Sequence, residues 1–256
     1  MDIGTLLNLA VTLVGALVVG GVLVGAVLMN KHAAGVASRG GGPLASGAAA
    51  LSAAMTQRLG YAAQGDPAAQ AADLAAHRMH MVRSVSGRSL HWMSETQASA
   101  GATRVSMSWQ IPLGTPARVP LHVVSSRRGG VAEWGKDAML SRSRSFQPRY
   151  SVALTPRDPA TAAKLVAYTE PGYEAAAHAV LEDPELSRWL VGLAFVDLRV
   201  EPGVVRFDDP FQEALLAPLG GPLAAMRMLT PEGIEVVVGF HTALGAGLCR
   251  LAERVS

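Results

Sequence analysis

The 256-residue chain contains one cysteine, few lysines and few aromatic residues. Cys249 is its single cysteine, so no disulfide can form within the chain, and this thiol is interpreted as a small buried side chain on the last helix. A reducing compartment fits, although many periplasmic domains also lack disulfides. Aromatic residues make up 5% of the chain, so its core must consist mostly of Leu, Val, Ala and Met.

The chain also lacks the common catalytic and nucleotide-binding motifs. It has no P-loop, no G-x-G-x-x-G after a strand, no H-E-x-x-H, no G-x-S-x-G and no C-x-x-C. We therefore assign no catalytic, cofactor-binding or metal-binding residue and expect no cofactor. An enzyme of unrecognised type stays an alternative, because catalysis does not require one of these motifs.

Charge is absent from one long segment at the N-terminus. The 28 residues from Ile3 to Asn30 include no charged side chain, and a helix over about 5–29 is long enough to cross a hydrocarbon core of ~30 Å. A cleaved signal peptide would need a positive N-terminal region and a shorter apolar run. Asp2 is instead the only charge before the segment. We predict an uncleaved transmembrane anchor over residues 1–30.

Flanking charges predict how this anchor is oriented. Asp2 precedes it, whereas Lys31, His32 and Arg39 follow it. Because basic residues favour the cytoplasmic side, the rest of the chain is expected in the cytoplasm, below a bacterial inner membrane that the chain crosses once. Enrichment in Ala, Gly and Arg is our reason for expecting a bacterial source.

Small residues recur every four positions within the predicted anchor. Gly21 and Gly25 form a G-x-x-x-G step, and Ala16 and Gly20 form a second small-residue step. Such steps allow two membrane helices to approach closely. Self-association through this face is one hypothesis; ordinary membrane composition is the alternative.

Residues 31–50 are predicted to be a flexible linker, because a Gly run at 40–42 precedes Pro43. Residues 51–256 are predicted to be one soluble α+β domain. A helix is expected over about 44–63, where Leu51, Met55 and Leu59 are spaced by four.

Short runs with alternating hydrophobicity then predict an antiparallel sheet. The predicted strands are 79–86, 88–96, 103–112, 118–125 and 149–154, with a later hairpin of 195–200 and 204–207. Helices are expected over 173–181, 184–193 and 241–254, and the apolar run 234–238 is either a strand or a helix start. This order of elements indicates an α+β fold, with an antiparallel sheet packed with helices.

The N-terminal span and linker are followed by LGY at 59–61, SGRSLHW at 86–92, FQPRYSV at 146–152, AVLEDPELSRWL at 179–190 and VDLRVEPGVVRF at 196–207. Together these segments resemble a group of bacterial single-span membrane proteins of unknown function. The resemblance covers most of the chain in short pieces. It implies a cytoplasmic α+β domain on a membrane stalk, and it implies no activity.

Two small groups of residues are candidate sites. His77 and His80 form H-x-x-H with His91 nearby, which could bind a metal, but no Cys or carboxylate lies at ligand spacing, and surface histidines are favoured. Asp208 and Asp209 could hold a cation or act as acid and base. A turn leading into a helix N-terminus is favoured for them.

Two further charged segments have simpler interpretations. Glu182, Asp183 and Glu185 surround Pro184 and are interpreted as acidic first-turn residues of a helix. The run SRSRSF at 141–146, with Arg127 and Arg128 before it, could bind phosphate groups. We favour the interpretation that it is a solvent-exposed loop.

The charge is divided unevenly along the chain. Residues 31–157 hold 15 Lys and Arg against 5 Asp and Glu, a net of +10, whereas residues 158–256 hold 7 against 14, a net of −7. This division suggests a basic half, 51–157, and an acidic half, 158–256. The halves could complement each other within the molecule, or the basic half could contact anionic lipid.

These features together predict a binding or interaction module without catalytic activity, displayed at the cytoplasmic face of a bacterial inner membrane. The expected ligand is a protein partner or a second copy of the chain, and no nucleic acid is expected. One alternative is an extracytoplasmic structural protein of the envelope. The other is an enzyme that uses Asp208 and Asp209, or His77 and His80.

Overall fold

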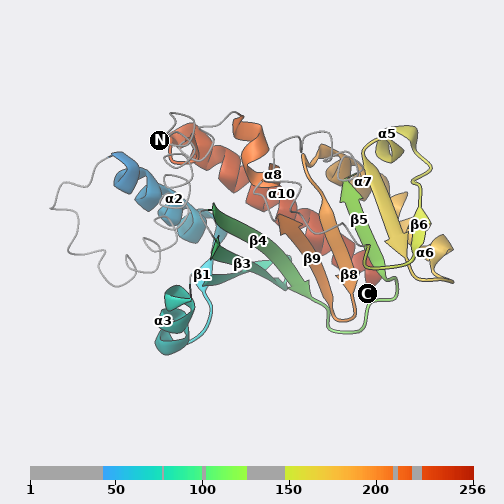
Figure 1. Ribbon diagram of the computed structural model, residues 1–256, viewed down its shortest axis with the longest axis horizontal. Coiled ribbons are helices and arrows are strands. Elements are labelled where there is room, and N and C mark those ends of the chain that lie inside the picture. Colours follow the sequence, from blue (N-terminus) through green and yellow to red (C-terminus); the bar gives the residue numbers. More distant parts are fainter. Residues whose placement is uncertain (1–42, 77, 100–101, 126–147, 210–212, 221–226) are drawn as a thin grey trace. The chain divides into compact units, whose positions relative to one another are not determined.

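The computed structural model describes residues 43–76, 78–99, 102–125, 148–209, 213–220 and 227–256. These residues form an α+β fold in which strands pair antiparallel and helices pack with them (Figure 1). The predicted anchor, with Ala16, Gly20, Gly21 and Gly25, lies outside the described residues. The chain separates into unit 1, 1–108 with 210–244, and unit 2, 109–209 with 245–256.

Unit 1 combines the N-terminal part of the described chain with the first half of the last helix. Its elements are α2 (Pro43–Leu59), β1 (Ala62–Ala63), α3 (Pro67–Ala75), β2 (Arg78–Val85), β3 (Arg88–Ser99), most of β4 (Ala102–Pro112), α8 (Glu213–Leu216), η1 (Ala217–Leu219) and the start of α10 (Pro231–Val255). The strands lie in the order β1-β2-β3-β4. Helix α2 begins at Pro43, inside the range predicted as linker.

A tight hairpin joins β2 and β3, as the sequence predicted. Ser86 and Gly87 form the two-residue loop, with φ of 50° and 75°, and Val85 pairs with Arg88. Two successive positive φ angles match the right-handed twist of the strands, and glycine adopts such an angle without strain. The turn therefore sets the register that places alternate side chains on opposite faces of this hairpin.

The core of unit 1 lies on one face of that hairpin. Met79 and Met81 of β2 are buried, as are Leu90 and Trp92 of β3. Buried side chains of α2 and α10 complete this core: Leu51, Met55, Ile234, Val237 and Leu244. The opposite face carries half-buried and exposed side chains.

Unit 2 holds the remaining strands and the shorter helices. Its elements are the end of β4, β5 (Leu121–Ser125), β6 (Val152–Leu154), α5 (Pro159–Ala162), β7 (Leu165–Thr169), α6 (Glu174–Leu181), α7 (Pro184–Gly192), β8 (Asp197–Glu201), β9 (Val204–Asp209) and the end of α10. The strands lie in the order β4-β9-β8-β5-β7-β6.

The β8–β9 hairpin was predicted, and the structure confirms it. Glu201 pairs with Val204 across Pro202 and Gly203, whose φ is 81°. Proline followed by a glycine with positive φ is typical of a type II turn. One side of these strands is apolar, and its buried residues are Leu198, Val200, Val205 and Phe207.

Strand β7 was not predicted. Leu165, Ala167 and Thr169 point into the core, whereas Val166 and Tyr168 are half-buried on the other side. The burial alternates, but the side chains on both faces are largely apolar, so the sequence shows no contrast between them. Its antiparallel pairing with β5 and β6 identifies it as an interior strand.

Helix α10 is one 25-residue helix. The predicted helix over 241–254 is therefore extended, and 234–238 is its first part rather than a strand. Among the described helices, α10 alone is long and apolar enough to cross a membrane, although 56% of its apolar window is buried inside the protein. Leu244, Leu248 and Leu251 are at most 1% exposed, which is typical of a core helix. Cys249 is buried on it, which confirms that prediction.

Candidate functional site

A set of charged side chains in unit 2 lies on the face of the sheet opposite its apolar core. We call this set the charged face; its members are His122 of β5, Asp197, Arg199 and Glu201 of β8, and Arg206 and Asp208 of β9. Strand geometry produces it, because alternate residues of β8 and β9 are charged and those between them are apolar. Arg199 pairs in register with His122 on one side and with Arg206 on the other.

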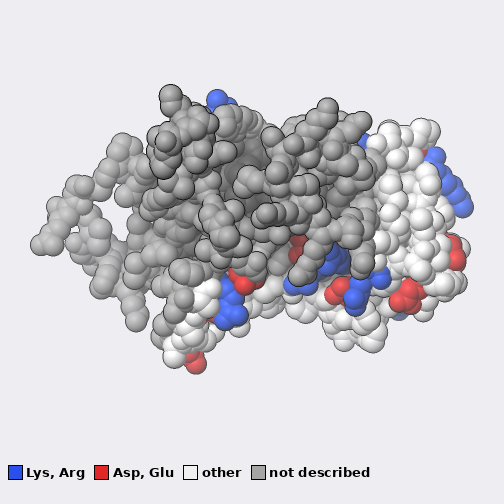
Figure 2. Space-filling view, viewed as in Figure 1, with Lys and Arg blue, Asp and Glu red and all other residues white. Residues whose placement is uncertain are grey.

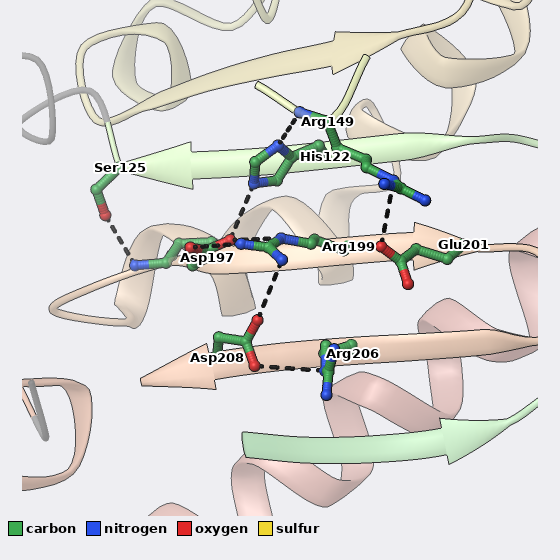
Figure 3. Close-up of polar contacts among 9 residues, drawn as sticks. His122, Ser125, Arg149, Asp197, Arg199, Glu201, Arg206 and Asp208 are labelled. Carbon is green, nitrogen blue, oxygen red and sulfur yellow. Dashed lines mark hydrogen bonds and ion pairs between the residues drawn. The ribbon is translucent and has the colours of Figure 1, made fainter. Parts of the chain in front are cut away.

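A buried histidine–aspartate pair lies at one end of the charged face (Figure 3). His122 Nε2 and Asp197 Oδ1 are 2.9 Å apart, and both side chains are 1% exposed. The backbone N–H of Arg149 donates to His122 Nδ1 over 3.0 Å. Because Nδ1 accepts that bond, the ring proton is on Nε2 and is donated to the carboxylate.

An alternating chain of arginine and aspartate continues across β8 and β9. Arg199 lies 3.3 Å from Asp197 and 3.6 Å from Asp208, and Arg206 lies 3.5 Å from the other oxygen of Asp208. Burial raises the pKa of Asp208, whereas the positive charges of Arg206 and Arg199 oppose that rise. Figure 3 shows the Arg199 guanidinium between the two aspartates. Each carboxylate on this part of the face is thus matched by an arginine.

The rim of the charged face is more exposed. Arg149 reaches Glu201 over 3.4 Å, with side chains 57% and 21% exposed. An ion pair this open to water contributes little to stability. The rim therefore offers charged groups of both signs to an approaching molecule.

The geometry of the charged face does not resemble a nucleophilic catalytic centre. Both ring nitrogens of His122 are engaged, so neither can act as a general base while these bonds hold. Ser125 follows on β5 but lies on the opposite face, and its Oγ accepts the N–H of Val196 over 2.8 Å. Ser125 and His122 therefore cannot form the serine–histidine contact that such a centre requires.

Unit 1 contains a different buried polar cluster. His241 of α10 is fully buried, and its Nδ1 lies 3.0 Å from the hydroxyl of Tyr61. Arg83 of β2, 7% exposed, donates to the backbone carbonyl of His241 and stacks on the Tyr61 ring, 5.0 Å from its centroid. The Trp92 ring lies 4.9 Å from the His241 ring. Burial, assisted by the charge of Arg83, lowers the pKa of His241 to about 3.

The other face of β2 and β3 brings two of the predicted histidines together. His80 Nε2 lies 2.9 Å from His91 Nδ1, and both rings are half-buried. Burial lowers the pKa of each ring, and for His80 the neighbouring His91 adds to the effect. His77 lies outside the described residues. Within the described residues no group of three or more His, Cys, Asp and Glu side chains could hold a metal ion.

Asp208 does not have the helix-capping role favoured for it and Asp209, because its carboxylate contacts Arg199 and Arg206. Residues 210–212, where a helix capped by Asp209 would begin, lie outside the described residues. Asp208 and Asp209 end strand β9, and successive residues of a strand point to opposite faces. Asp208 belongs to the charged face, whereas Asp209 is fully buried on the other side. The same alternation excludes the alternative in which the two carboxylates hold one cation.

The predicted acidic helix N-terminus around Pro184 is confirmed for Asp183 and Glu185, whereas Glu182 lies at the C-terminal end of α6. The Asp183 carboxylate accepts from the N–H groups of Glu185 and Leu186, each over 3.0 Å, at the start of α7. The bond from Leu186 contributes most to lowering the pKa of Asp183. This aspartate therefore has a structural role. Arg127, Arg128 and the run 141–146 lie outside the described residues.

Ion pairs join the basic half of the sequence to the acidic half within each unit. Arg58 binds Glu235 in unit 1 through bonds of 2.5 and 2.9 Å, and in unit 2 Arg157 binds Glu182 over 3.1 Å. Arg149 and Glu201 form a third such pair. On the described surface in Figure 2, basic and acidic atoms lie next to one another. For these residues the ion pairs favour the alternative in which the two halves complement each other internally.

Sequence reasoning missed the two buried clusters. His122 stands within the apolar run LHVV, and Asp197 follows Phe195 and Val196, so each reads as an isolated polar residue. The strict alternation of DLRVE and VVRFDD was the available signal, because it places every charge of each segment but Asp209 on one face. Nothing near Arg83 indicates its partner His241, which is 158 residues away. No family model, curated protein or solved structure matches the chain.

Proposed function

We propose that the protein is a membrane-anchored interaction module that binds a protein partner at the cytoplasmic face of a bacterial inner membrane and catalyses no reaction. The charged face of unit 2 is the observation that carries the binding part of this proposal. The uncharged segment from Ile3 to Asn30 supports the anchor, and the basic residues that follow it support the orientation.

The charge balance of the charged face supports a protein partner over a nucleic acid. A phosphate backbone is bound by Lys and Arg side chains that can neutralise it. Arg199 and Arg206 are already matched by Asp197 and Asp208, so a phosphate would have to displace a carboxylate. A mixed-charge protein surface can instead add complementary contacts at the exposed rim, where Arg149 and Glu201 lie.

The use of the buried histidines supports a non-catalytic role. His122 is held between Asp197 and the backbone of Arg149. His241 is fully buried, and its lowered pKa keeps it neutral at physiological pH. A general base needs access to its substrate and a pKa near the working pH. Among the described residues, neither of these two histidines meets both requirements.

A site-specific photocrosslinker tests where the partner binds. The crosslinking residue would replace Arg149 at the exposed rim of the charged face, or Arg188 on the surface of α7 as a matched control, in the full chain within cells. We expect a discrete crosslinked species from position 149 and none from position 188. Equal crosslinking at both positions, or none at 149 in a membrane-associated chain, would contradict the proposed interface.

A further inference from the structure

Two imidazole rings lie together on the half-buried face of the β2–β3 hairpin, which is the face opposite the core of unit 1. His80 and His91 lie on neighbouring strands, and the register pairs His91 with Val82 and His80 with Met93. The histidines are therefore diagonal neighbours on one face. Met79 and Met81, the residues flanking His80, point to the opposite, buried face.

The distance between the rings is close to that required by a shared metal ion. The nitrogens are 2.9 Å apart. In a tetrahedral zinc site, with Zn–N bonds of 2.0–2.1 Å, two imidazole nitrogens lie about 3.3 Å apart. An opening of a few tenths of an ångström, with a small rotation of each ring, would direct both lone pairs to one point.

One carboxylate acts on the pair. The negative charge of Asp73 on α3 acts on the His80 ring, and Asp73 is held 3.2 Å from Arg78 at the start of β2. Among the described residues, the ring nitrogens of His80 and His91 have no hydrogen-bond partner other than each other. Their ring nitrogens are therefore available to a ligand once the mutual bond opens.

We propose that His80 and His91 form a two-histidine site for a divalent transition-metal ion, with water completing the coordination. Imidazole nitrogen is a favoured ligand of Zn²⁺, Cu²⁺ and Ni²⁺, and Cu²⁺ binds most tightly in such a site. Two protein ligands leave coordination positions open. The site belongs to unit 1 and is independent of the function proposed for the charged face.

Metal titration of the full chain in detergent micelles tests this site. Zn²⁺ and Cu²⁺ are titrated separately into the wild type and into His80→Gln, His91→Gln and His178→Gln. His178 is a half-buried histidine of α6 in unit 2 and serves as the matched control. We expect each of the first two substitutions to weaken the binding of both ions about tenfold or more, since each removes one of two ligands. The control should bind as the wild type does.

A second measurement uses the unchanged chain, so it does not depend on the folding of a variant. Carbethoxylation of each histidine is followed by mass spectrometry with and without Zn²⁺. Protection of His80 and His91 together, without protection of His178, is expected. Binding of Zn²⁺ that leaves both rings fully reactive would overturn the proposal, as would His80→Gln and His91→Gln variants that bind both metals like the wild type.

Discussion

The two units bury polar groups in opposite ways. Unit 1 encloses Arg83 with the neutral side chains of Tyr61 and His241, and no carboxylate among the described residues pairs with this arginine. Unit 2 places Arg199 between the carboxylates of Asp197 and Asp208. In unit 1 burial, with a smaller contribution from the charge of Arg83, keeps His241 neutral, whereas in unit 2 each charge is paired with an opposite one. The same residue type should therefore respond differently to substitution in the two units.

Among the substitutions compared at neutral pH, removing the central carboxylate of unit 2 should have the largest effect. Asp197→Ala leaves His122 Nε2–H without its acceptor and deprives Arg199 of one partner. Breaking a buried pair in this way costs on the order of 3 kcal/mol of unfolding free energy. Hydrogen exchange measured by mass spectrometry should show faster exchange in β5 and β8 and little change in β2. Unchanged exchange in β8 would contradict the role given to Asp197.

Acid should weaken unit 1 through His241. The pKa of this residue is about 3 in the fold, against 6.5 for an unperturbed histidine. Between these pH values the unfolded chain binds a proton that the folded chain does not. The free energy of unfolding therefore falls as the pH falls from 6.5 toward 3, by about 1.4 kcal/mol per unit, and above 6.5 this contribution is constant. The measurement is the free energy of unfolding of the wild type and of His241→Gln, obtained by denaturant unfolding at each pH.

The difference between those two proteins isolates His241, because other titrating groups are common to both. We expect the stability of the wild type to fall more steeply than that of the variant below pH 6.5. Parallel curves would show that His241 does not hold the lowered pKa.

Replacing the two arginines by methionine compares the units directly. Arg199→Met removes one cationic partner from both Asp197 and Asp208. It should lower the free energy of unfolding by about 1–2 kcal/mol, because these ion pairs are partly exposed. Arg83→Met removes a buried charge that no described carboxylate balances, so the change should stay within about 1 kcal/mol. Denaturant unfolding measures both, with Arg188→Met as a surface control. A larger loss for Arg83 than for Arg199 would reverse the comparison.

The smallest effect is expected at the exposed ion pair of unit 1. Arg58 and Glu235 are 46% and 64% exposed, and water and salt screen such a pair. Thermal melting of Arg58→Ala should therefore match the wild type within error, in low and in high salt. A clear loss of stability that disappears in high salt would show that this pair links α2 to α10 more strongly than its exposure indicates.

The parts of this fold that were predictable from sequence are those determined by local patterns. Alternating hydrophobicity and turn residues located β2, β3, β4 and the β8–β9 hairpin, because a period of two and a glycine between two such runs can be recognised in a short stretch of sequence. Helix α7 was equally visible from Asp183 and Pro184. Strand β7 was missed because its two faces have similar polarity.

The candidate sites were harder to predict, because they depend on pairing between distant segments. His122 and Asp197 are 75 residues apart, and Tyr61 and His241 are 180 apart. Asp208 and Asp209 illustrate the converse, since adjacency in sequence suggested a shared role that strand geometry forbids. His80 and His91 lie between these cases, because the short hairpin that joins them was predicted and their contact was not.

Thiol labelling of intact cells most directly tests the proposed location of the chain at the cytoplasmic face of the membrane. Cys249 is replaced by serine, a single cysteine replaces Gly41, and a membrane-impermeant maleimide is applied before or after lysis. We expect the chain to sediment with membranes and position 41 to be labelled only after lysis. Labelling in intact cells would contradict the cytoplasmic orientation, and the partner would then have to be sought among components of the envelope.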